Sequence, residues 1–304
     1  MSTTEDRDPR FADIDRWPTG DAVMAMLDGQ IAALTAIRAA VPAIAAAAEA
    51  AAERLRNGGQ SGGGRLVYAG AGTSGRVAVQ DGVELGPTFG WPADRLAYLI
   101  AGGMAALAHS AEGAEDDAAA ARMAVAAEAV GPGDVVIGVA ASGRTPFTLA
   151  VIDSARHAGA LTIAIANNPG SALLAAADHA LLAATGSEII AGSTRMQAGT
   201  AQKAMLNMLS TAIMLRLGRV YRGLMVDMQI SNDKLLARAQ AMVAALAGCE
   251  DTAAAAALEK ANRNIKAAVL IARGETPAQA TARLAAHGGI LRAALEEGGD
   301  APVP

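Results

Sequence analysis

Two kinds of segment alternate along most of this chain. Apolar runs of about four to eight residues, which are typical of buried strands, are separated by longer stretches with helical spacing. We predict strands near 65–71, 96–101, 134–141, 160–167 and 179–185. Strands that alternate with helices indicate a parallel sheet covered by helices on both faces. The pattern therefore predicts an α/β fold, for which we assume the common doubly wound strand order 2-1-3-4-5.

Helical spacing also flanks the predicted sheet at both ends of the chain. Alanine-rich residues from about 21 to 56 predict helices with a break at Pro42, and a glycine-rich linker follows at 57–64. Near the C-terminus we predict short helices with breaks at Gly248, 274–277 and 288–289. We therefore expect an N-terminal helical segment (1–60), a central domain (61–231) and a C-terminal helical module (232–304).

Composition narrows the classes of protein to consider. The 304 residues have a net charge of −5, only 3% are aromatic, and no basic run is present, which argues against a nucleic-acid partner. Cys249 is the only cysteine, so a disulfide within the chain is excluded. Apolar stretches are interrupted by Gly, Pro or charge before the roughly 18–20 residues needed to span a bilayer. We expect a cytoplasmic protein without a membrane partner.

The turns after the first and third predicted strands carry candidate chemistry. Residues 65–76 run from an apolar strand into a glycine-rich turn with Thr73 and Ser74, and residues 134–145 repeat this design with Ser142. Glycines let backbone N–H groups converge on an anion at the start of a helix, and hydroxyls add further donors. In the assumed strand order these two loops are neighbours, so we predict that they hold one phosphate together.

The glycines of the first turn also match a competing motif. Gly70, Gly72 and Gly75 have the GxGxxG spacing of dinucleotide-binding proteins. Such a protein should carry an acidic residue at the end of its second strand, about 20 residues later, to hold the ribose. The second predicted strand instead ends in Gly102 and Gly103. We therefore disfavour a dinucleotide site, while a purely structural tight turn stays an alternative.

Two glutamates could supply acid–base chemistry beside a bound sugar. Glu84 comes near the end of the first sheet helix, and Glu115 follows the second strand. Elimination next to a carbonyl needs one group to remove a carbon-bound proton and another to protonate the departing oxygen. Paired carboxyl groups in different environments can supply both steps. The alternative is that either glutamate is an ordinary exposed helix residue.

A polar cluster precedes a long apolar helix that extends toward Gly218. Ser193 and Thr194 lie at the entrance of this helix, where a hydroxyl either caps the helix or contacts a ligand. Both roles stay open at this point.

The order and spacing of these segments resemble the N-acetylmuramic acid 6-phosphate etherases, a family of the sugar isomerase (SIS) superfamily. The matching segments include 4–9, 70–75, 84–90, 100–103, 112–116, 137–146, 192–203, 207–211 and 224–227. The resemblance covers nearly the whole chain. It implies an SIS-type, flavodoxin-like five-stranded parallel sheet with flanking helices, N-terminal helices and a C-terminal helical module.

The resemblance also implies a lyase reaction: cleavage of the lactyl ether of N-acetylmuramic acid 6-phosphate to N-acetylglucosamine 6-phosphate and D-lactate, in peptidoglycan amino-sugar recycling. It implies that Glu84 protonates the leaving lactate and later activates water, while Glu115 removes the C2 proton. The implied substrate- and phosphate-binding residues are Gly72, Thr73, Ser74, Ser142, Gly143, Arg144, Thr145, Ser193, Thr194 and Lys203. It further implies a homodimer and no metal or organic cofactor.

Some residues depart from the family pattern. Gln197 stands where the family usually has lysine, which removes a positive charge, and Ser187 replaces a common proline. Two alternatives stay open: a sugar phosphate aldose–ketose isomerase, and a non-catalytic sugar-phosphate sensor related to glucokinase regulatory protein. Both glutamates are retained, which favours the etherase, and release of lactate would separate it from both alternatives.

Overall fold

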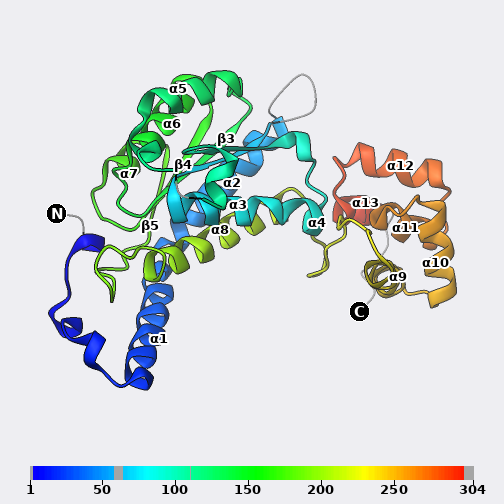
Figure 1. Cartoon of the computed structure of the whole chain (residues 1–304). Coiled ribbons are helices and arrows are strands. Elements are labelled where there is room, and N and C mark those ends of the chain that lie inside the picture. Colours follow the sequence, from blue (N-terminus) through cyan, green and yellow to red (C-terminus); the bar gives the residue numbers. More distant parts are fainter. Residues whose placement is uncertain (1–2, 58–63, 110, 298–304) are drawn as a thin grey trace. The chain divides into compact units, whose positions relative to one another are not determined.

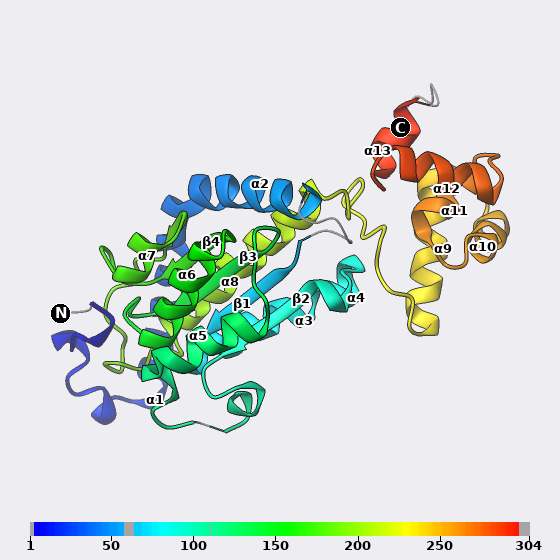
Figure 2. The same ribbon diagram turned by 90° about the horizontal axis from the view of Figure 1, so that it is seen from above.

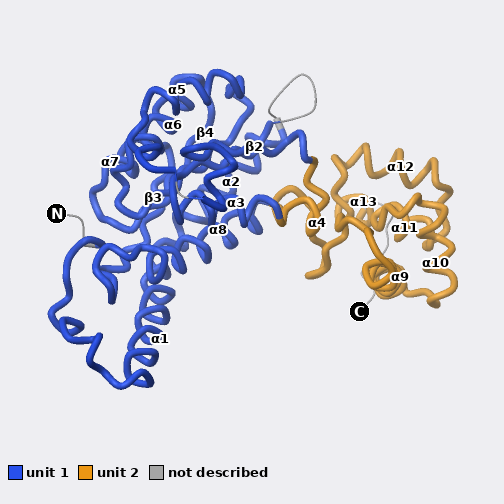
Figure 3. Tube along the Cα trace, viewed as in Figure 1, with its two compact units in different colours: residues 1–83, 93–213 blue, residues 84–92, 214–304 orange. Residues whose placement is uncertain are grey.

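The computed structural model describes residues 3–57, 64–109 and 111–297 (Figure 1). Two compact units make up the chain (Figure 3): unit 1 comprises 1–83 and 93–213, and unit 2 comprises 84–92 and 214–304. The N-terminal helices, which we expected to form a separate segment, join the sheet in unit 1, and the short segment 84–92 joins the C-terminal helices. The domain boundaries expected from the sequence stay a prediction, and most of the predicted linker lies outside the described residues.

The sheet of unit 1 confirms the predicted strands and their order. All neighbouring strands are parallel, in the order β2-β1-β3-β4-β5. In register, Gly70 at the end of β1 pairs with Ile100 of β2 and with Val139 of β3. The strands are β1 (Leu66–Gly70), β2 (Leu96–Ile100), β3 (Val135–Ala140), β4 (Leu161–Ala166) and β5 (His179–Leu182).

Successive side chains of each strand point to opposite faces of the sheet and contribute to the packing on each face. Val67 and Ala69 pack in one cluster with Val125 and Val151 of the covering helices. Tyr68 points to the other face, where its hydroxyl donates to Asp81. The first face is covered by α5 (Ala118–Ala127), α6 (Pro146–His157) and α7 (Ala172–Ala176), and α2 (Val41–Asn57) and α3 (Gly72–Val83) also pack on the sheet (Figure 2).

A buried carboxylate joins α3 to α8 (Gln197–Arg216). Asp81 is 5% exposed and accepts hydrogen bonds from the Tyr68 hydroxyl at 2.8 Å, Asn207 Nδ2 at 2.6 Å and Ser210 Oγ at 3.1 Å. Burial raises the pKa of Asp81, and these hydrogen bonds partly offset the rise. The helix α8 also buries Met205, Leu206, Leu209 and Ile213 completely. It is therefore a core helix rather than a surface helix.

The N-terminal helices differ from prediction in where they break. Helix α1 (Thr19–Ala36) ends in a 3-10 turn over Ile37–Ala40, and α2 begins at Val41. The predicted break is therefore present but lies a few residues before Pro42, which is the second residue of α2. Proline is tolerated in the first turn of a helix, where its missing N–H has no helical acceptor.

One described helical run passes a test of length and composition for a membrane span, although Asp28, Arg38 and Pro42 interrupt its apolar residues, as expected from the sequence. The helical run Thr19–Arg56 has 38 residues. Its most apolar stretch of 18 residues has a mean hydropathy of 1.8, and 33% of that stretch is buried. Among the described residues, a second candidate membrane span is found only when two helices, Asp233–Ala247 and Asp251–Lys260, are taken together, and these are bent by 107° relative to each other. Core helices pass the same test of length and composition, and Ala47 and Leu55 of the first run are 0% and 1% exposed.

Unit 2 contains the predicted short helices. Its breaks at Gly248, 273–276 and 287–290 confirm the predicted ones. Asn232 and Asn264 cap the helices that follow them, with their side chains accepting N–H groups at 2.9 Å, and Thr276 forms a capping box with Gln279. The helices are α4 (Leu85–Phe89), α9 (Asp233–Ala247), α10 (Asp251–Lys260), α11 (Ile265–Ala272), α12 (Pro277–Ala286) and α13 (Leu291–Glu297).

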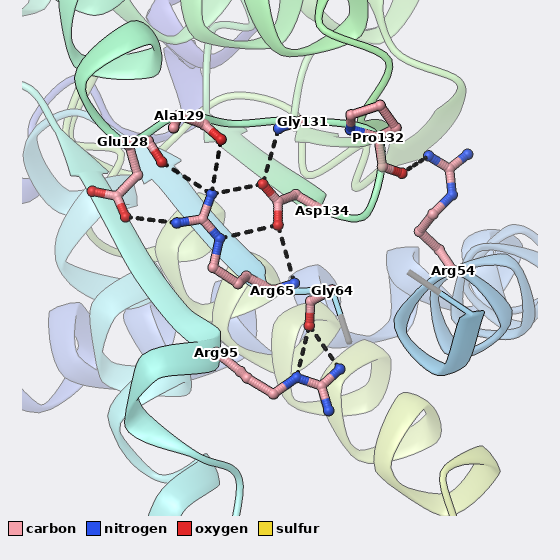
Figure 4. A network of polar contacts seen from close by, with 9 residues as sticks. All are labelled: Arg54, Gly64, Arg65, Arg95, Glu128, Ala129, Gly131, Pro132 and Asp134. Carbon is pink, nitrogen blue, oxygen red and sulfur yellow. Dashed lines mark hydrogen bonds and ion pairs between the residues drawn. The ribbon is translucent and has the colours of Figure 1, made fainter. Parts of the chain in front are cut away.

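A polar network fastens the strands where β1 and β3 begin (Figure 4). Arg65 forks onto the Asp134 carboxylate at 3.1 and 2.7 Å, and its Nη1 donates to Glu128 at 3.0 Å. Nearby, Arg95 donates to the Gly64 carbonyl at 2.8 Å, and Arg54 donates to the Pro132 carbonyl at 2.6 Å. These bonds hold the amino-terminal edge of the sheet, opposite the loops that carry the candidate chemistry.

We predict that Asp134→Asn lowers the free energy of unfolding by about 1–3 kcal/mol at pH 7, since it removes the charge from these hydrogen bonds. Burial opposes ionisation of Asp134, but hydrogen bonds from Arg65 and Gly131 outweigh it and lower its pKa. Because the pKa of Asp134 is lower in the folded than in the unfolded protein, its ionisation stabilises the fold at pH values above the unfolded pKa, near 3.9. This stabilisation is lost as the pH falls through the folded pKa. Urea unfolding should therefore show a difference at pH 7 that shrinks at pH 3; an equal difference at both would contradict the prediction.

Candidate functional site

A pocket of about 480 Å³ lies in unit 1, at the carboxyl edge of β1 and β3. Its polar lining comes from both hydroxyl loops and from three further segments of unit 1, around residues 5, 115–116 and 192–194. The structure thus brings the two loops to one cavity, because parallel neighbouring strands end at the same edge. The lining includes Glu5, Gly72, Thr73, Ser74, Glu115, Asp116, Ser142, Arg144, Thr145, Gly192 and Thr194.

The first loop depends on a close approach between β1 and α3. A Cβ on Gly75 would lie 3.0 Å from the Gly70 carbonyl oxygen, so glycine lets the helix begin directly against the strand end. Gly72 has a φ of +53°, which favours glycine as the first residue of α3. Thr73 and the buried Ser74 therefore sit in the first helical turn, beside the positive end of the helix dipole.

The second loop places the start of α6 at the same pocket. Gly143 has a φ of +62°, and a Cβ there would lie 2.2 Å from Ser171 Oγ, so only glycine fits. The Ser142 hydroxyl accepts the Arg144 backbone N–H at 3.2 Å, and Thr145 precedes Pro146, the first residue of α6. Gly143 itself is not among the described lining residues, so its contribution here is to the turn.

Positive and negative groups meet in this pocket. Arg144 is exposed at its rim, while Glu115 and Asp116 lie on a 3-10 turn (Ala114–Asp116) that follows Gly113. Gly113 has a φ of +70°, which turns the chain before this segment. Hydroxyls, helix N-termini and an arginine can hold an anion, and an exposed carboxylate can take up a proton. Both kinds of group line one cavity.

The N-terminal segment adds a carboxylate that sequence reasoning missed. Glu5 lines the pocket, and its Oε2 lies 3.0 Å from where a Cβ on Gly192 would be. Thr4 is fully buried and exchanges hydrogen bonds with Asn168, whose Nδ2 also donates to the Ala141 carbonyl at 3.2 Å. The segment 4–9 belongs to the family motif, which could have signalled a position near the site, and Asp116 was missed in the same way.

Glu188 determines where α8 begins. It is 1% exposed, and its two oxygens accept the N–H groups of Gln197 at 3.0 Å and Ala198 at 2.9 Å. Burial raises the pKa of Glu188, and these two hydrogen bonds partly offset the rise. Glu188 thus caps the first two N–H groups of α8. Thr194 lines the pocket, whereas Ser193 is not among the described lining residues.

Gln197 and Ser187, which both depart from the family pattern, touch each other. Gln197 is 6% exposed, and its Nε2 donates to the Ser187 carbonyl at 3.3 Å. Neither residue is among the described lining of the pocket, so Gln197 acts here in packing against α1, beside Gly29. Lys203 is also outside that lining: it is exposed on α8, and its charge lowers the pKa of Asp81 against the larger effect of burial.

The structure does not bring Glu84 into this pocket. Glu84 belongs to unit 2 and directly follows Val83, the last residue of α3. The twelve residues of α3 span about 18 Å from the first loop to this end. Of the two predicted glutamates, only Glu115 lines the described pocket.

A second cavity of about 390 Å³ adjoins the first and shares Gly72 and Glu115 with it. Arg76 lines this cavity and donates to the carbonyls of Leu107 at 2.9 Å and Ala106 at 3.0 Å, which holds the loop after β2. Within the described residues there is no group of three or more His, Cys, Asp or Glu arranged to hold a metal ion.

Comparison with known proteins places this site in a family. Residues 44–156 match the glucokinase regulatory protein N-terminal SIS domain, and residues 111–212 match the SIS domain. The chain is 48% identical over 296 residues to N-acetylmuramic acid 6-phosphate etherase of Deinococcus radiodurans, covering 97% of this chain and 95% of that protein. It is 49% identical over 267 residues to the etherase of Symbiobacterium thermophilum, covering 88% and 87%.

Solved structures show a weaker similarity. A putative phosphosugar isomerase of Bacteroides fragilis is 19% identical, with a TM-score of 0.47, covering 68% of this chain and 95% of that one. The sequence relatives carry the assignment, because they match nearly the full length. Together with the SIS domain match they confirm the resemblance read from the motifs: the chain belongs to the N-acetylmuramic acid 6-phosphate etherase family.

Proposed function

We propose that this chain is a carbon–oxygen lyase that cleaves the D-lactyl ether of N-acetylmuramic acid 6-phosphate, giving N-acetylglucosamine 6-phosphate and D-lactate. The observation that carries this proposal is the meeting of both hydroxyl loops and Glu115 in one pocket, in a member of the etherase family. The relatives bear that activity in their names. We place the reaction in cytoplasmic recycling of peptidoglycan amino sugars.

The phosphate would bind where the two helices begin. Ser74, Ser142 and Thr145 would donate hydroxyl hydrogen bonds, Thr73 would assist, and Arg144 would add a positive charge at the rim. Two helix N-termini favour a dianion at this position. The sugar would then extend over the pocket toward Glu115, with Thr194 on the opposite lining segment.

The reaction would proceed by elimination and then addition. In the ring-opened sugar the C1 aldehyde acidifies the C2 proton, which Glu115 removes. The electron pair forms the C2–C3 double bond and the C3–O bond breaks. The family resemblance assigns protonation of the departing lactate oxygen to Glu84, which does not line the pocket of the single chain. Glu84 then takes a proton from water, whose oxygen adds to C3, and C2 is protonated again. This sequence consumes one water and needs no redox step.

We also propose that the protein is a homodimer, as the family resemblance implies. Helix α1 carries an apolar stripe at helical spacing that is largely exposed in the single chain: Val23 is 57%, Leu27 52%, Ile31 53% and Leu34 43% exposed. An exposed stripe of this kind marks an interaction surface. A second copy would bury it.

The first test is incubation with N-acetylmuramic acid 6-phosphate in heavy water, following D-lactate and deuterium at C2. We expect the wild type to release lactate and incorporate deuterium. Glu115→Gln should lose both, because no base removes the C2 proton, whereas Glu84→Gln should retain C2 exchange and lose at least about a hundredfold in lactate release.

Glu53→Gln, an exposed glutamate on α2, is the matched control and should behave as the wild type. Interconversion of an aldose and a ketose phosphate without lactate would favour the isomerase. Binding without any turnover would favour the sensor.

The phosphate site has its own test. Ser74→Ala removes one hydrogen bond to a charged group, worth about 1.5–3 kcal/mol, so KM should rise by about ten- to a hundredfold. Ser231→Ala, an exposed serine in unit 2, should leave KM unchanged. Steady-state kinetics on both variants decides this, and an unchanged KM for Ser74→Ala would remove that hydroxyl from the phosphate site.

For the dimer, we expect Leu27→Glu to shift the sedimenting species from dimer to monomer, since a charge would be buried in the middle of the stripe. Ala32→Glu, which is exposed on another face of α1, should stay dimeric. A wild type that sediments as a monomer at all concentrations would refute the proposed assembly.

A further inference from the structure

The short segment 84–92, which connects α3 to the residues before β2, belongs to unit 2 together with the C-terminal helices. The Gln229 backbone N–H donates to the Pro87 carbonyl at 3.0 Å. The Arg219 guanidinium lies 3.4 Å from both the Phe89 and the Gly90 carbonyl oxygens. These contacts join the middle and the C-terminal end of α4 to residues more than a hundred positions later in the chain.

Close packing reinforces these hydrogen bonds. Gly90 has a φ of +60°, and a Cβ there would lie 2.4 Å from the Asp227 carbonyl oxygen, so the two backbones touch. Trp91 is 2% exposed and carries the Arg219 guanidinium 5.8 Å from its ring centre. Leu85 is equally buried. The segment is therefore anchored from Pro87 to Trp91.

A buried charge cluster lies behind this anchor. The Asp227 carboxylate forms an ion pair with Lys266 and lies 3.7 Å from Arg219 Nη1. Lys266 also donates to the Gly289 carbonyl at 2.7 Å, in the turn between α12 and α13. The Lys266 side chain is only 7% exposed. The cluster thus connects the anchor of α4 to the last helices of the chain.

We propose that Arg219, Asp227 and Lys266 are positioning residues for Glu84, and that the C-terminal helices serve the reaction through them. Glu84 is exposed, and its carbonyl accepts the Thr88 N–H at 3.1 Å, so its backbone is hydrogen bonded to the first turn of α4. The cluster of Arg219, Asp227 and Lys266 in turn fixes the position of α4 through its C-terminal end. This inference rests on the proposed role of Glu84 as the acid that protonates lactate.

Arg219 is the best residue to change. Its side chain is 24% exposed, and without it Asp227 keeps its ion pair with Lys266, whereas removal of Lys266 would take away the closer counter-charge of buried Asp227. We compare Arg219→Met, Arg219→Lys and Glu84→Gln with the wild type. Arg238→Met, an exposed arginine on α9, is the matched control. Each full-length protein is assayed in heavy water for lactate release and C2 deuterium, and its melting temperature is recorded.

If the cluster positions Glu84, Arg219→Met reproduces the Glu84→Gln pattern. Its kcat for lactate release should fall by about ten- to a hundredfold, the cost of misplacing a catalytic group by about 1 Å, with KM and C2 exchange unchanged. Arg219→Lys should recover much of the rate, and Arg238→Met all of it.

A parallel fall of exchange and lactate release in Arg219→Met would show a merely structural cluster and overturn the inference. Unchanged lactate release would overturn it as well. The proposed function fails separately, when the wild type releases no lactate, and loss of C2 exchange in Glu84→Gln would instead reject the assigned acid role.

Discussion

The parallel pairing of β1 with β3 is the constraint on which the candidate site depends. Its register sets Gly70 beside Val139, so the two strands end together and the two hydroxyl loops open on one cavity. A shift of one residue would displace one loop by about 3.3 Å and turn its strand's side chains to the other face. The close contact between Gly70 and Gly75 likewise fixes where α3 begins relative to the end of β1. The positions of the two loops are therefore set by contacts between backbones.

Residues that stabilise the fold and residues that are available to a ligand lie at opposite edges of this sheet. The amino-terminal edge carries the forked Arg65–Asp134 pair, whose members are hydrogen bonded to each other and to nearby backbone groups. At the carboxyl edge, Thr73, Thr145 and Arg144 line an open pocket. Polar groups that satisfy one another hold a fold, whereas groups that face a cavity are available to a ligand. The sheet thus separates the two tasks by about the length of its strands.

Local patterns were sufficient to predict the strands and both loops, because buried strands and glycine turns are encoded by neighbouring residues. The break before α2 was misplaced at Pro42, since a proline in a first turn has the same sequence signature as one that ends a helix. Glu5 was missed because its place depends on contacts made by Thr4 with Asn168, 164 positions away. Likewise, no local pattern shows that Gly90 lies against Asp227. What escaped prediction were contacts between distant segments of the chain.

Under the proposed mechanism, the two carboxylates belong to different compact units: Glu115 stays with the phosphate pocket, and Glu84 stays with the C-terminal helices. The base must be placed against C2 as soon as the phosphate binds, so it is best carried by the binding unit itself. The acid acts only when the C3–O bond breaks, and its placement depends on α4 and on what holds α4. If Glu84 is the acid, its placement therefore depends on the C-terminal helices, none of whose residues lines the described pocket.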